Sequence, residues 1–336
     1  MPKYDITTIG GAVKDTTFYT DKGRVFATPN NLTAQRMLAF EYGAKITPKE
    51  AYSGLGGGAA NTAVSLSRLG FKVAIIAKIG NDEVGQEILA KLKKEGIETK
   101  YIQIDNKNYT GFSLILATDK KEREHVIFTC RGSNESLVIN PKQISNLNSN
   151  WFYITSLCGK DWPKSLKLIF DLAASKKIKI VWKPGGLQLQ SGKRVLTNFL
   201  KQTQILILNK DEAIELALSG IKLGRKNPNY LNRPLYLLNI LREWGPKMIV
   251  ITEGKKGAWV YDGKKIYHQK AFKAKTINTT GVGDSFGSAF LAGLIVNKND
   301  INKALKWGMI DSASVTTKVG AQDGLLSRKE LLNKIK

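Results

Sequence analysis

Short apolar runs alternate with stretches of helical periodicity from residue 60 onward. The apolar runs are rich in Ile, Val and aromatic residues, which is typical of strands buried on both faces of a parallel sheet. The stretches between them repeat apolar residues every three or four positions, which predicts amphipathic helices. The predicted strands are 72–77, 151–154, 178–182, 205–208 and 248–252, and the predicted helices are 60–69, 84–95, 164–176, 211–219 and 234–244. This order predicts an α/β fold with a central, mostly parallel sheet and helices on both faces.

Two segments interrupt the alternation. Residues 14–53 follow the first predicted strand, Tyr4–Ile9, and residues 101–129 separate two core elements. The second segment contains the alternating runs GFSLILAT and EHVIFT around the charged sequence DKKER, which predicts an antiparallel hairpin. We therefore expect both segments to form a small β-sheet lid. It would be inserted into a core made of residues 1–13, 54–100 and 130–336.

The composition is that of a globular protein with a sizeable core, since 42% of the 336 residues are hydrophobic. The two cysteines, Cys130 and Cys158, are too few for a disulfide framework or a four-cysteine zinc site. No apolar run approaches the roughly 18 residues expected of a membrane span. We therefore expect a soluble, cytoplasmic protein with no membrane partner.

The net charge is the unusual property of the composition. The chain has 52 Lys and Arg against 28 Asp and Glu, which gives +24. Such an excess raises a basic nucleic-acid-associated protein as an alternative. The lysines are scattered over helix faces and turns, however, without a long basic block, an arginine-rich arm or the spacing of a zinc finger. No specific nucleic acid is therefore expected as a partner, and this class stays a remote alternative.

The segment NTTGVGDSFGSAFLAGLIV, residues 278–296, is the strongest candidate for chemistry. Gly281 and Gly283 allow a sharp turn before a helix of small and apolar residues. The amides of Gly281, Val282 and Gly283 would then form an anion-binding cradle at the helix N-terminus. Asp284 lies in the first turn of this helix. Its carboxylate is either an ordinary acid at the positive end of a helix or a general base beside a phosphate site.

The segment SGLGGGAANTAVSLSRLG, residues 53–70, matches the dinucleotide fingerprint G-x-G-x-x-A and raises a nicotinamide oxidoreductase as an alternative. The context disagrees, because the residues before it contain Pro48 and do not predict a buried strand. The next strand is followed by Lys78 and not by an acid for a ribose. The glycines could also only allow a loop and a helix to pack closely. The polar Asn61, at the apolar start of the helix, indicates a hydroxylated ligand.

Two further motifs follow predicted strands. Asn209 and Glu212 share one face of the first turn of a helix, where they suit hydrated magnesium (Mg²⁺) near phosphates. The same spacing also suits the reciprocal hydrogen bonds of a capping box. The sequence TEGKKG, residues 252–257, lies between two strands. It is either an ordinary hairpin turn or a backbone ledge for a nucleotide.

Taken in order, the motifs resemble those of the ribokinase or PfkB-like carbohydrate kinase family over nearly the whole chain. They are the acid in GGAVKD, the segment GGGAANTAVSLSRLGF followed by IGNDEVG, and the boxes NKDE, TEGKKG, NTTGVGDSF and KVGAQDG. The resemblance implies an ATP-dependent kinase that acts on a hydroxyl of a small sugar, with a nucleoside (adenosine-like) kinase as the alternative. It also implies that the lid closes over the substrate and can mediate a homodimer.

Carried over by position, the site residues of the family fall on these motifs. The resemblance implies that Asp284 is the general base and that Gly281, Val282 and Gly283 form the anion hole. It assigns substrate hydroxyls to Asp15, Gly57 and Asn61, Mg²⁺ and phosphate to Asn209 and Glu212, and the nucleotide to Thr252, Gly254 and Gly257. Val282 stands in place of the usual Ala. Asn278 stands where relatives that use a monovalent cation have an acid, which leaves activation by potassium undecided. Lys183, in VWKPGG, receives no role.

The substrate class is not determined by these motifs. Four aromatic residues of the first lid segment, Phe18, Tyr19, Phe40 and Tyr42, are able to stack on a nucleoside base. They are equally suited to packing within the lid or in a dimer interface. We favour packing for these aromatic residues.

Overall fold

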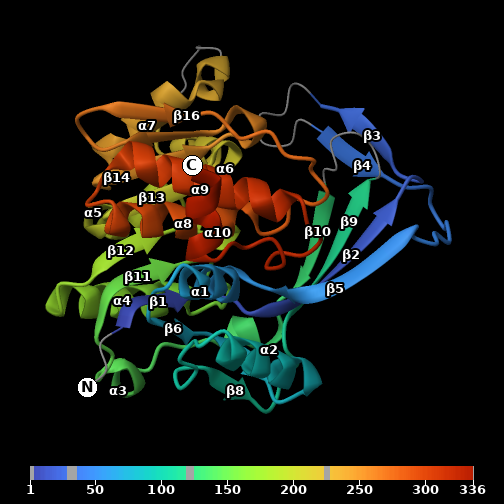
Figure 1. Cartoon of the computed structure of the whole chain (residues 1–336), viewed down its shortest axis with the longest axis horizontal. Helices are drawn as coiled ribbons and strands as arrows, with labels where there is room; N and C mark the ends of the chain where they lie inside the picture. Colours follow the sequence, from blue (N-terminus) through green and yellow to red (C-terminus); the bar gives the residue numbers. More distant parts are fainter. Residues whose placement is uncertain (1–3, 29–35, 119–124, 223–227, 336) are drawn as a thin grey trace.

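The computed structural model describes residues 4–28, 36–118, 125–222 and 228–335. Within these residues the central sheet has eight strands, of which those from β14 to β6 are parallel and the two at the other edge are antiparallel (Figure 1). In sheet order they are β16 (Ile266–Gln269), β15 (Ala258–Tyr261), β14 (Met248–Thr252), β13 (Ile205–Asn209), β12 (Lys179–Trp182), β11 (Ser149–Ile154), β1 (Tyr4–Ile9) and β6 (Val73–Ile76). The predicted mostly parallel sheet is confirmed.

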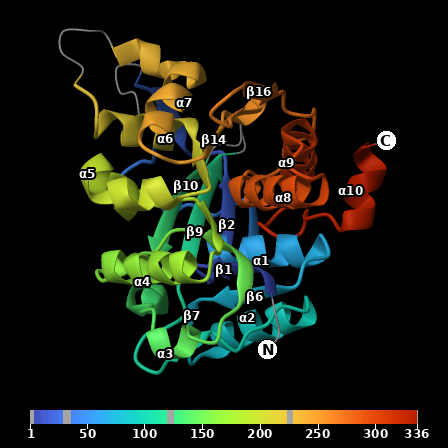
Figure 2. The same ribbon diagram turned by 90° about the vertical axis from the view of Figure 1, so that its left-hand side faces the viewer.

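Helices cover both faces of this sheet (Figure 2), and each face has its own buried apolar cluster. Burial on both sides is the reason that the strands read as continuous apolar runs. One face packs against α3 (Pro141–Ile144), α4 (Trp162–Ser175), α5 (Gly186–Gln202), α6 (Lys210–Leu218) and α7 (Pro234–Glu243). The other packs against α1 (Gly58–Arg68), α2 (Glu83–Lys94), α8 (Val282–Val296), α9 (Ile301–Thr316) and α10 (Arg328–Ile335).

All predicted core strands and helices named above are present, with ends that differ by no more than two residues. Helices α5 and α9 were not predicted. In α5, Gly192 has a φ of 73°, so the helix is kinked and its apolar spacing is broken. Helix α9 is buried on most sides. It therefore has no wide polar face from which a helical period can be read.

The lid segments form a second, four-stranded sheet that projects from one side of the core (Figure 1). Its strands are β10 (His125–Cys130), β9 (Phe112–Thr118), β2 (Val13–Thr20) and β5 (Glu50–Gly56). The predicted hairpin of β9 and β10 is antiparallel, as expected, while its charged turn DKKER lies outside the described residues. Two short pairs accompany this sheet and its connection to the core: β3 (Arg24–Ala27) with β4 (Arg36–Ala39), and β7 (Lys78–Gly80) with β8 (Gln103–Asp105).

Strand β5 explains why the glycine-rich segment does not bind a dinucleotide in the Rossmann manner. In a Rossmann unit, a strand of the central parallel sheet leads into the glycine turn. Here the preceding strand pairs antiparallel with β2 in the small sheet. As the sequence predicts, the strand before the glycine-rich segment is not a strand of the central parallel sheet. The nicotinamide alternative is therefore not supported.

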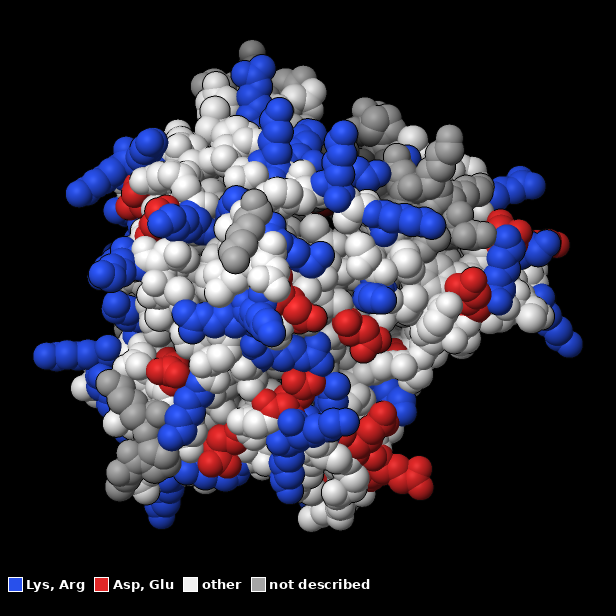
Figure 3. Space-filling view, viewed as in Figure 1, with Lys and Arg blue, Asp and Glu red and all other residues white. Residues whose placement is uncertain are grey.

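On the face shown in Figure 3, Lys and Arg side chains are spread over the whole outline, with acidic residues among them. This distribution agrees with a solvated basic surface more than with a single nucleic-acid patch. Among the helices in the described ranges, none has the length and apolar character needed to cross a membrane.

Candidate active site

Asp284 is held by hydrogen bonds to both of its carboxylate oxygens. It lies in the first turn of α8, and 12% of its side chain is exposed. Asn61, in α1, donates from Nδ2 to Oδ2 at 3.0 Å. Lys183, just after β12, donates from Nζ to Oδ1 at 2.6 Å. Three elements of the core therefore fix the orientation of one carboxylate, and the predicted pair of Asn61 and Asp284 lies in direct contact.

Asn61 is itself oriented by a residue that the sequence reasoning missed. The side-chain amide of Gln322 donates from Nε2 to Oδ1 of Asn61 at 3.1 Å, so the Asn61 Nδ2 donor faces Asp284. Gln322 belongs to the KVGAQDG motif, which contributes to the family resemblance but in which the sequence assigns no role to a single residue. The feature that marks this role is the burial of the polar side chain of Gln322 inside a loop, and a single sequence does not show burial.

The N-terminus of α8 forms a partly open row of amides. Gly281, the N-cap, is left-handed with a φ of 76°, and a Cβ at this position would lie 2.6 Å from the Cβ of Ala321. Within the described part of the chain the amides of Gly281 and Gly283 have no hydrogen-bond partner, whereas the amide of Val282 donates to Thr279 O at 3.4 Å. Two of the three predicted cradle donors therefore remain available for an anion.

Asn278 precedes this row and is buried. Its Oδ1 accepts from the amide of Thr280 at 2.8 Å, and among the described residues its Nδ2 has no partner. Oδ1 therefore has one of its two lone pairs engaged within the turn, and Nδ2, which is a donor, cannot coordinate a cation.

Asp15 lies on β2 of the lid sheet and faces the core. Burial raises the pKa of Asp15 to about 6 and repulsion from Asp284 adds to the rise, while a hydrogen bond with Ser113 opposes it. Gly56 lies against it, because a Cβ there would be 1.9 Å from Oδ2 of Asp15 and would displace the carboxylate. The carboxylates of Asp15, on β2, and Asp284, on α8, therefore affect each other electrostatically, and both are of a type that accepts hydrogen bonds from hydroxyl groups.

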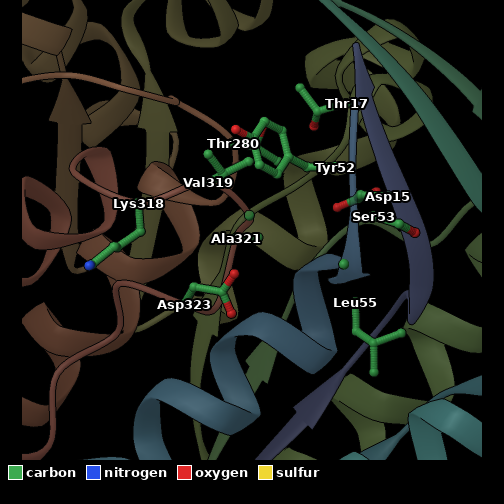
Figure 4. A pocket seen from close by; sticks show the side chains of 12 residues that line it. Asp15, Thr17, Tyr52, Ser53, Leu55, Thr280, Lys318, Val319, Ala321 and Asp323 are labelled. Carbon is green, nitrogen blue, oxygen red and sulfur yellow. The ribbon is translucent and has the colours of Figure 1, made fainter. Parts of the chain in front are cut away.

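A pocket of about 260 Å³ separates the lid from the core. Figure 4 shows Asp15 of the lid on one side and the loop from Lys318 to Asp323 on the other, with the ring of Tyr52 extending from the lid strand β5 and overlapping Thr280 in this view. Asp284 is not among the described residues that line this pocket, although its charge reaches Asp15. The pocket is large enough for a small sugar and has hydroxyl, ammonium and carboxylate groups on its wall.

Gly57, the N-cap of α1, has a φ of 95°, and a Cβ there would lie 2.5 Å from Gly11 O. Its glycine identity therefore follows from close packing between α1 and the end of β1. Close packing of a loop and a helix is one of the explanations that the sequence offers for the glycines of residues 53–70. The same contact brings the start of α1, and hence Asn61, toward Asp284.

Asn209 and Glu212 form the reciprocal capping box of α6. Glu212 Oε2 accepts from the Asn209 amide at 2.8 Å, and Asn209 Oδ1 accepts from the Glu212 amide at 2.8 Å. Burial raises the pKa of Glu212, although the charge of Lys183 and the Asn209 amide oppose the rise. Burial alone would lower the pKa of Lys183, but attraction to Asp284 and then to Glu212 outweighs this effect, so its pKa is raised.

These residues fit Mg²⁺ in one particular way. No cluster of three or more His, Cys, Asp or Glu able to hold a metal occurs in the described ranges, so a cage made by the protein alone does not fit. Glu212 nevertheless offers Oε1, which has no hydrogen-bond partner among the described residues. One carboxylate together with waters and nucleotide phosphates is the usual environment of Mg²⁺.

The TEGKKG turn lies next to Asn209 in the sheet. Thr252 pairs with Asn209 at the carboxyl ends of β14 and β13. The turn contains a short 3₁₀ helix, Gly254–Lys256, in which Gly254 has a φ of 51° and open space where a Cβ would be. Gly257 has a φ of 98°, and a Cβ there would lie 2.0 Å from Gln269 O. Gly257 therefore serves the packing of the turn against β16, whereas Gly254 borders free space.

The lid aromatics do not form one stacking surface. Phe18 and Phe40 line a separate apolar hollow, and successive residues of β2 face opposite sides, so Phe18 points away from Asp15. Tyr42 is fully exposed, and Tyr19 is buried with its hydroxyl donating to Ile277 O at 3.2 Å. The aromatic residue that borders the Asp15 pocket is Tyr52, which was not singled out from the sequence.

Comparison with known proteins gives one consistent result. The model of the pfkB family carbohydrate kinases matches residues 32–328. A ribokinase of Haemophilus influenzae is 27% identical over 312 residues, which cover 90% of this chain and 95% of that protein. The crystal structure of a ribokinase from Cryptococcus neoformans in complex with ADP has a TM-score of 0.78 at 21% identity, covering 99% of this chain and 100% of that one. A nucleoside kinase of Methanocaldococcus jannaschii has a TM-score of 0.73 at 23% identity, with coverages of 100% and 98%.

Proposed function

Because the chain belongs to the pfkB family of carbohydrate kinases, which transfer a phosphoryl group to an alcohol, we propose that it phosphorylates a hydroxyl of a small sugar with ATP as donor. We assign the role of general base to Asp284. The observation that carries this proposal is the carboxylate of Asp284, fixed by Asn61 and Lys183 beside the open amides of α8. A carboxylate that only stabilised the helix dipole would not need partners from two other elements.

In the proposed reaction, the sugar hydroxyl oxygen attacks the γ-phosphorus and its proton passes to Asp284. The bond between the γ-phosphorus and the oxygen that bridges it to the β-phosphate breaks, and ADP leaves. Asp15 accepts hydrogen bonds from other sugar hydroxyls, and Asn61 keeps Asp284 oriented. The amides of Gly281 and Gly283 stabilise the charge on the transferred group, each by about 3 to 4 kcal/mol if they act like known oxyanion donors. Positioning and charge stabilisation are the main tasks of a protein in phosphoryl transfer.

The nucleotide site is proposed at the carboxyl ends of β13 and β14. Thr252 and Gly254 border the nucleotide there, while Gly257 shapes the turn that holds them. Glu212, with Asn209 as its capping partner, would hold Mg²⁺ together with the phosphates. The ion would neutralise part of the phosphate charge.

A nucleoside kinase of the same family is the second candidate, and Tyr52 is the observation that favours it. Tyr52 borders the pocket and is 41% exposed as a residue, so its ring is available to stack on a base. ADP release with ribose, fructose, ketodeoxygluconate, adenosine and other nucleosides separates the two candidates. Turnover with nucleosides alone would replace the sugar proposal.

The lid edge also supports a homodimer. Val126, Ile127 and Phe128 of the edge strand β10 are all more than a third exposed, and so are Phe26 and Met37 of the β3–β4 pair. An unpaired strand edge with apolar side chains is suited to pairing with a second copy. Light scattering at increasing protein concentration tests this part of the proposal, and a monomer at all concentrations would contradict it.

Asp284→Asn tests the assignment of the general base. We expect turnover to fall by about 10² to 10⁴, because the proton acceptor is lost while the shape of the side chain is kept. Steady-state ADP release with the best substrate gives the rate, and circular dichroism checks the fold. Asp171→Asn, on the exposed face of α4, is the matched control and should keep the rate of the original protein. Equal rates for Asp284→Asn and the control would remove Asp284 from this role.

A further inference from the structure

Among the described residues, Lys183 is the one charged residue that contacts Asp284, and the proposed function uses it only to orient that carboxylate. It follows the buried residue Trp182 at the carboxyl end of β12, and 24% of its side chain is exposed. Its ammonium lies 2.6 Å from Oδ1 of Asp284. Within the described residues this is its only hydrogen-bond partner, whereas an ammonium has three donors. Two donors are therefore left for a ligand.

The neighbours of Lys183 place it on the phosphate side of Asp284. Asn61 holds the other carboxylate oxygen, Oδ2, and belongs to the proposed sugar side. A Cβ built on Gly283 would have Nζ of Lys183 as its nearest atom, at 3.4 Å, so the ammonium lies beside the amide row of α8. Among the charged groups that act on Glu212, the proposed Mg²⁺ ligand, Lys183 has the largest effect. The ammonium thus lies beside both the proposed general base and the proposed anion hole.

A permanent ion pair with Lys183 would work against a general base, because a nearby positive charge stabilises the carboxylate and makes it a weaker proton acceptor. The pair becomes useful if the ammonium has a second anion to bind. As the hydroxyl proton reaches Asp284, the carboxylate loses its charge and its attraction for Lys183 falls. Negative charge meanwhile develops on the phosphoryl group and on ADP.

We propose, on the basis of the kinase function above, that Lys183 is a further catalytic residue whose ammonium binds an oxygen of the transferring γ-phosphoryl group. In the free protein it rests on Asp284. With ATP bound it shares its donors between Asp284 and the γ-phosphoryl oxygens. During transfer it stays with the phosphoryl group as Asp284 accepts the proton. Lysine suits this task because its compact charge binds phosphate without requiring a planar, two-point geometry.

Lys183→Met tests the proposal by nucleotide affinity, which does not require the sugar to be known. Calorimetry compares the β,γ-imido analogue of ATP with ADP, both with Mg²⁺. We expect the preference for the analogue over ADP to fall by about 10-fold in the variant, as for the loss of one charge-assisted hydrogen bond, while affinity for ADP stays within about 3-fold. Lys183→Arg keeps the charge and should retain most of the preference.

Turnover gives the second measurement. Lys183→Met should lower kcat by about 10² to 10³, as for loss of one donor to a developing anion, and should leave the sugar KM within about 3-fold. The matched control is Lys78→Met, which removes a lysine that is 18% exposed and lies 3.6 Å from Asp105, outside the site. This control should keep kcat and the nucleotide preference, whatever its effect on stability.

The possible outcomes distinguish an error in the role of Lys183 from an error in the kinase function itself. If Lys183→Met lowers kcat but leaves the preference for the γ-phosphoryl group unchanged, Lys183 only positions Asp284 and the proposal is wrong. The proposal is also wrong if the variant keeps both kcat and the preference. If the original protein binds neither nucleotide and releases no ADP with any substrate, the kinase function fails first, and the role of Lys183 falls with it.

Discussion

Asp15 is expected to lower the stability of the free protein, and this can be measured. Its carboxylate lies at the pocket between the lid and the core, where the charge of Asp284 repels it, and a Cβ on Gly56 would lie 1.9 Å from its Oδ2. The pKa of Asp15 rises from its ordinary value of 3.8 to about 6. A group that must be ionised to accept hydroxyl hydrogen bonds is thus placed where ionisation is unfavourable.

The sign of the effect follows from proton binding in the two states. Because the pKa is higher in the folded protein, the folded state keeps a proton between about pH 4 and 6 that the unfolded chain has released. The free energy of unfolding therefore falls as pH rises through this window, and the full cost is present above about pH 6. A change from 3.8 to about 6 corresponds to about 3 kcal/mol. The Asp15→Asn variant removes the charge and keeps the shape.

We expect Asp15→Asn to raise the free energy of unfolding by about 1 to 3 kcal/mol at pH 8 and to change it little at pH 4. Urea unfolding followed by tryptophan fluorescence at pH 4, 6 and 8 measures this difference. The sugar KM should rise by about 10-fold or more in the same variant, because a charged acceptor is lost.

The control for this experiment is Asp21→Asn, also in the lid. Asp21 is exposed and lies 3.2 Å from Lys49, whose hydrogen bond lowers the pKa of Asp21. Its replacement should give no stabilisation that grows with pH. If the stability difference for Asp15→Asn were the same at all three pH values, the buried charge of Asp15 would not be its cause.

Two further predictions concern other parts of the site. Glu212→Gln keeps the capping geometry of α6 but removes the charge, so the Mg²⁺ concentration for half-maximal activity should rise by about 10-fold; an unchanged magnesium titration would leave Glu212 as a capping residue only. Gly56→Ala places a Cβ where Oδ2 of Asp15 lies, so the sugar KM should rise by about 10-fold with a smaller change in kcat; an unaltered KM would show that Asp15 can move without loss of binding.

The core could be predicted from sequence because its signals are local. Each parallel strand is an apolar run buried on both faces, and most helices show a polar side. The exceptions have physical causes. The kink at Gly192 interrupts the apolar periodicity of α5. Because α9 is buried on most sides, it has no polar face that differs from its apolar face. The small sheet was expected because its hairpin alternates strictly, yet the pairing of β2 with both β5 and β9 depends on contacts distant in sequence.

The site likewise contains residues that the sequence identifies and contacts that it does not. Asp284, Asn61 and Asp15 were chosen from motifs, and the fold brings their charges and hydrogen bonds together across more than 200 residues of chain. The contacts of Lys183 and Gln322 could not be predicted, because they depend on the direction of side chains at the meeting of β12, α1 and α8. For Asn209 and Glu212 the structure has the capping box, which is compatible with a role toward Mg²⁺ but does not require it.

The small sheet is not a module that can be cut away. The chain passes from the large sheet into it at β2, returns at α1, and enters it again at β9 before coming back to the core. A deletion of β2 and β5 would remove Asp15 and also Tyr19, whose hydroxyl donates to Ile277 O of the core. New acceptor preferences are therefore more readily obtained by exchanging single side chains on its inner wall than by transplanting the whole sheet from a relative.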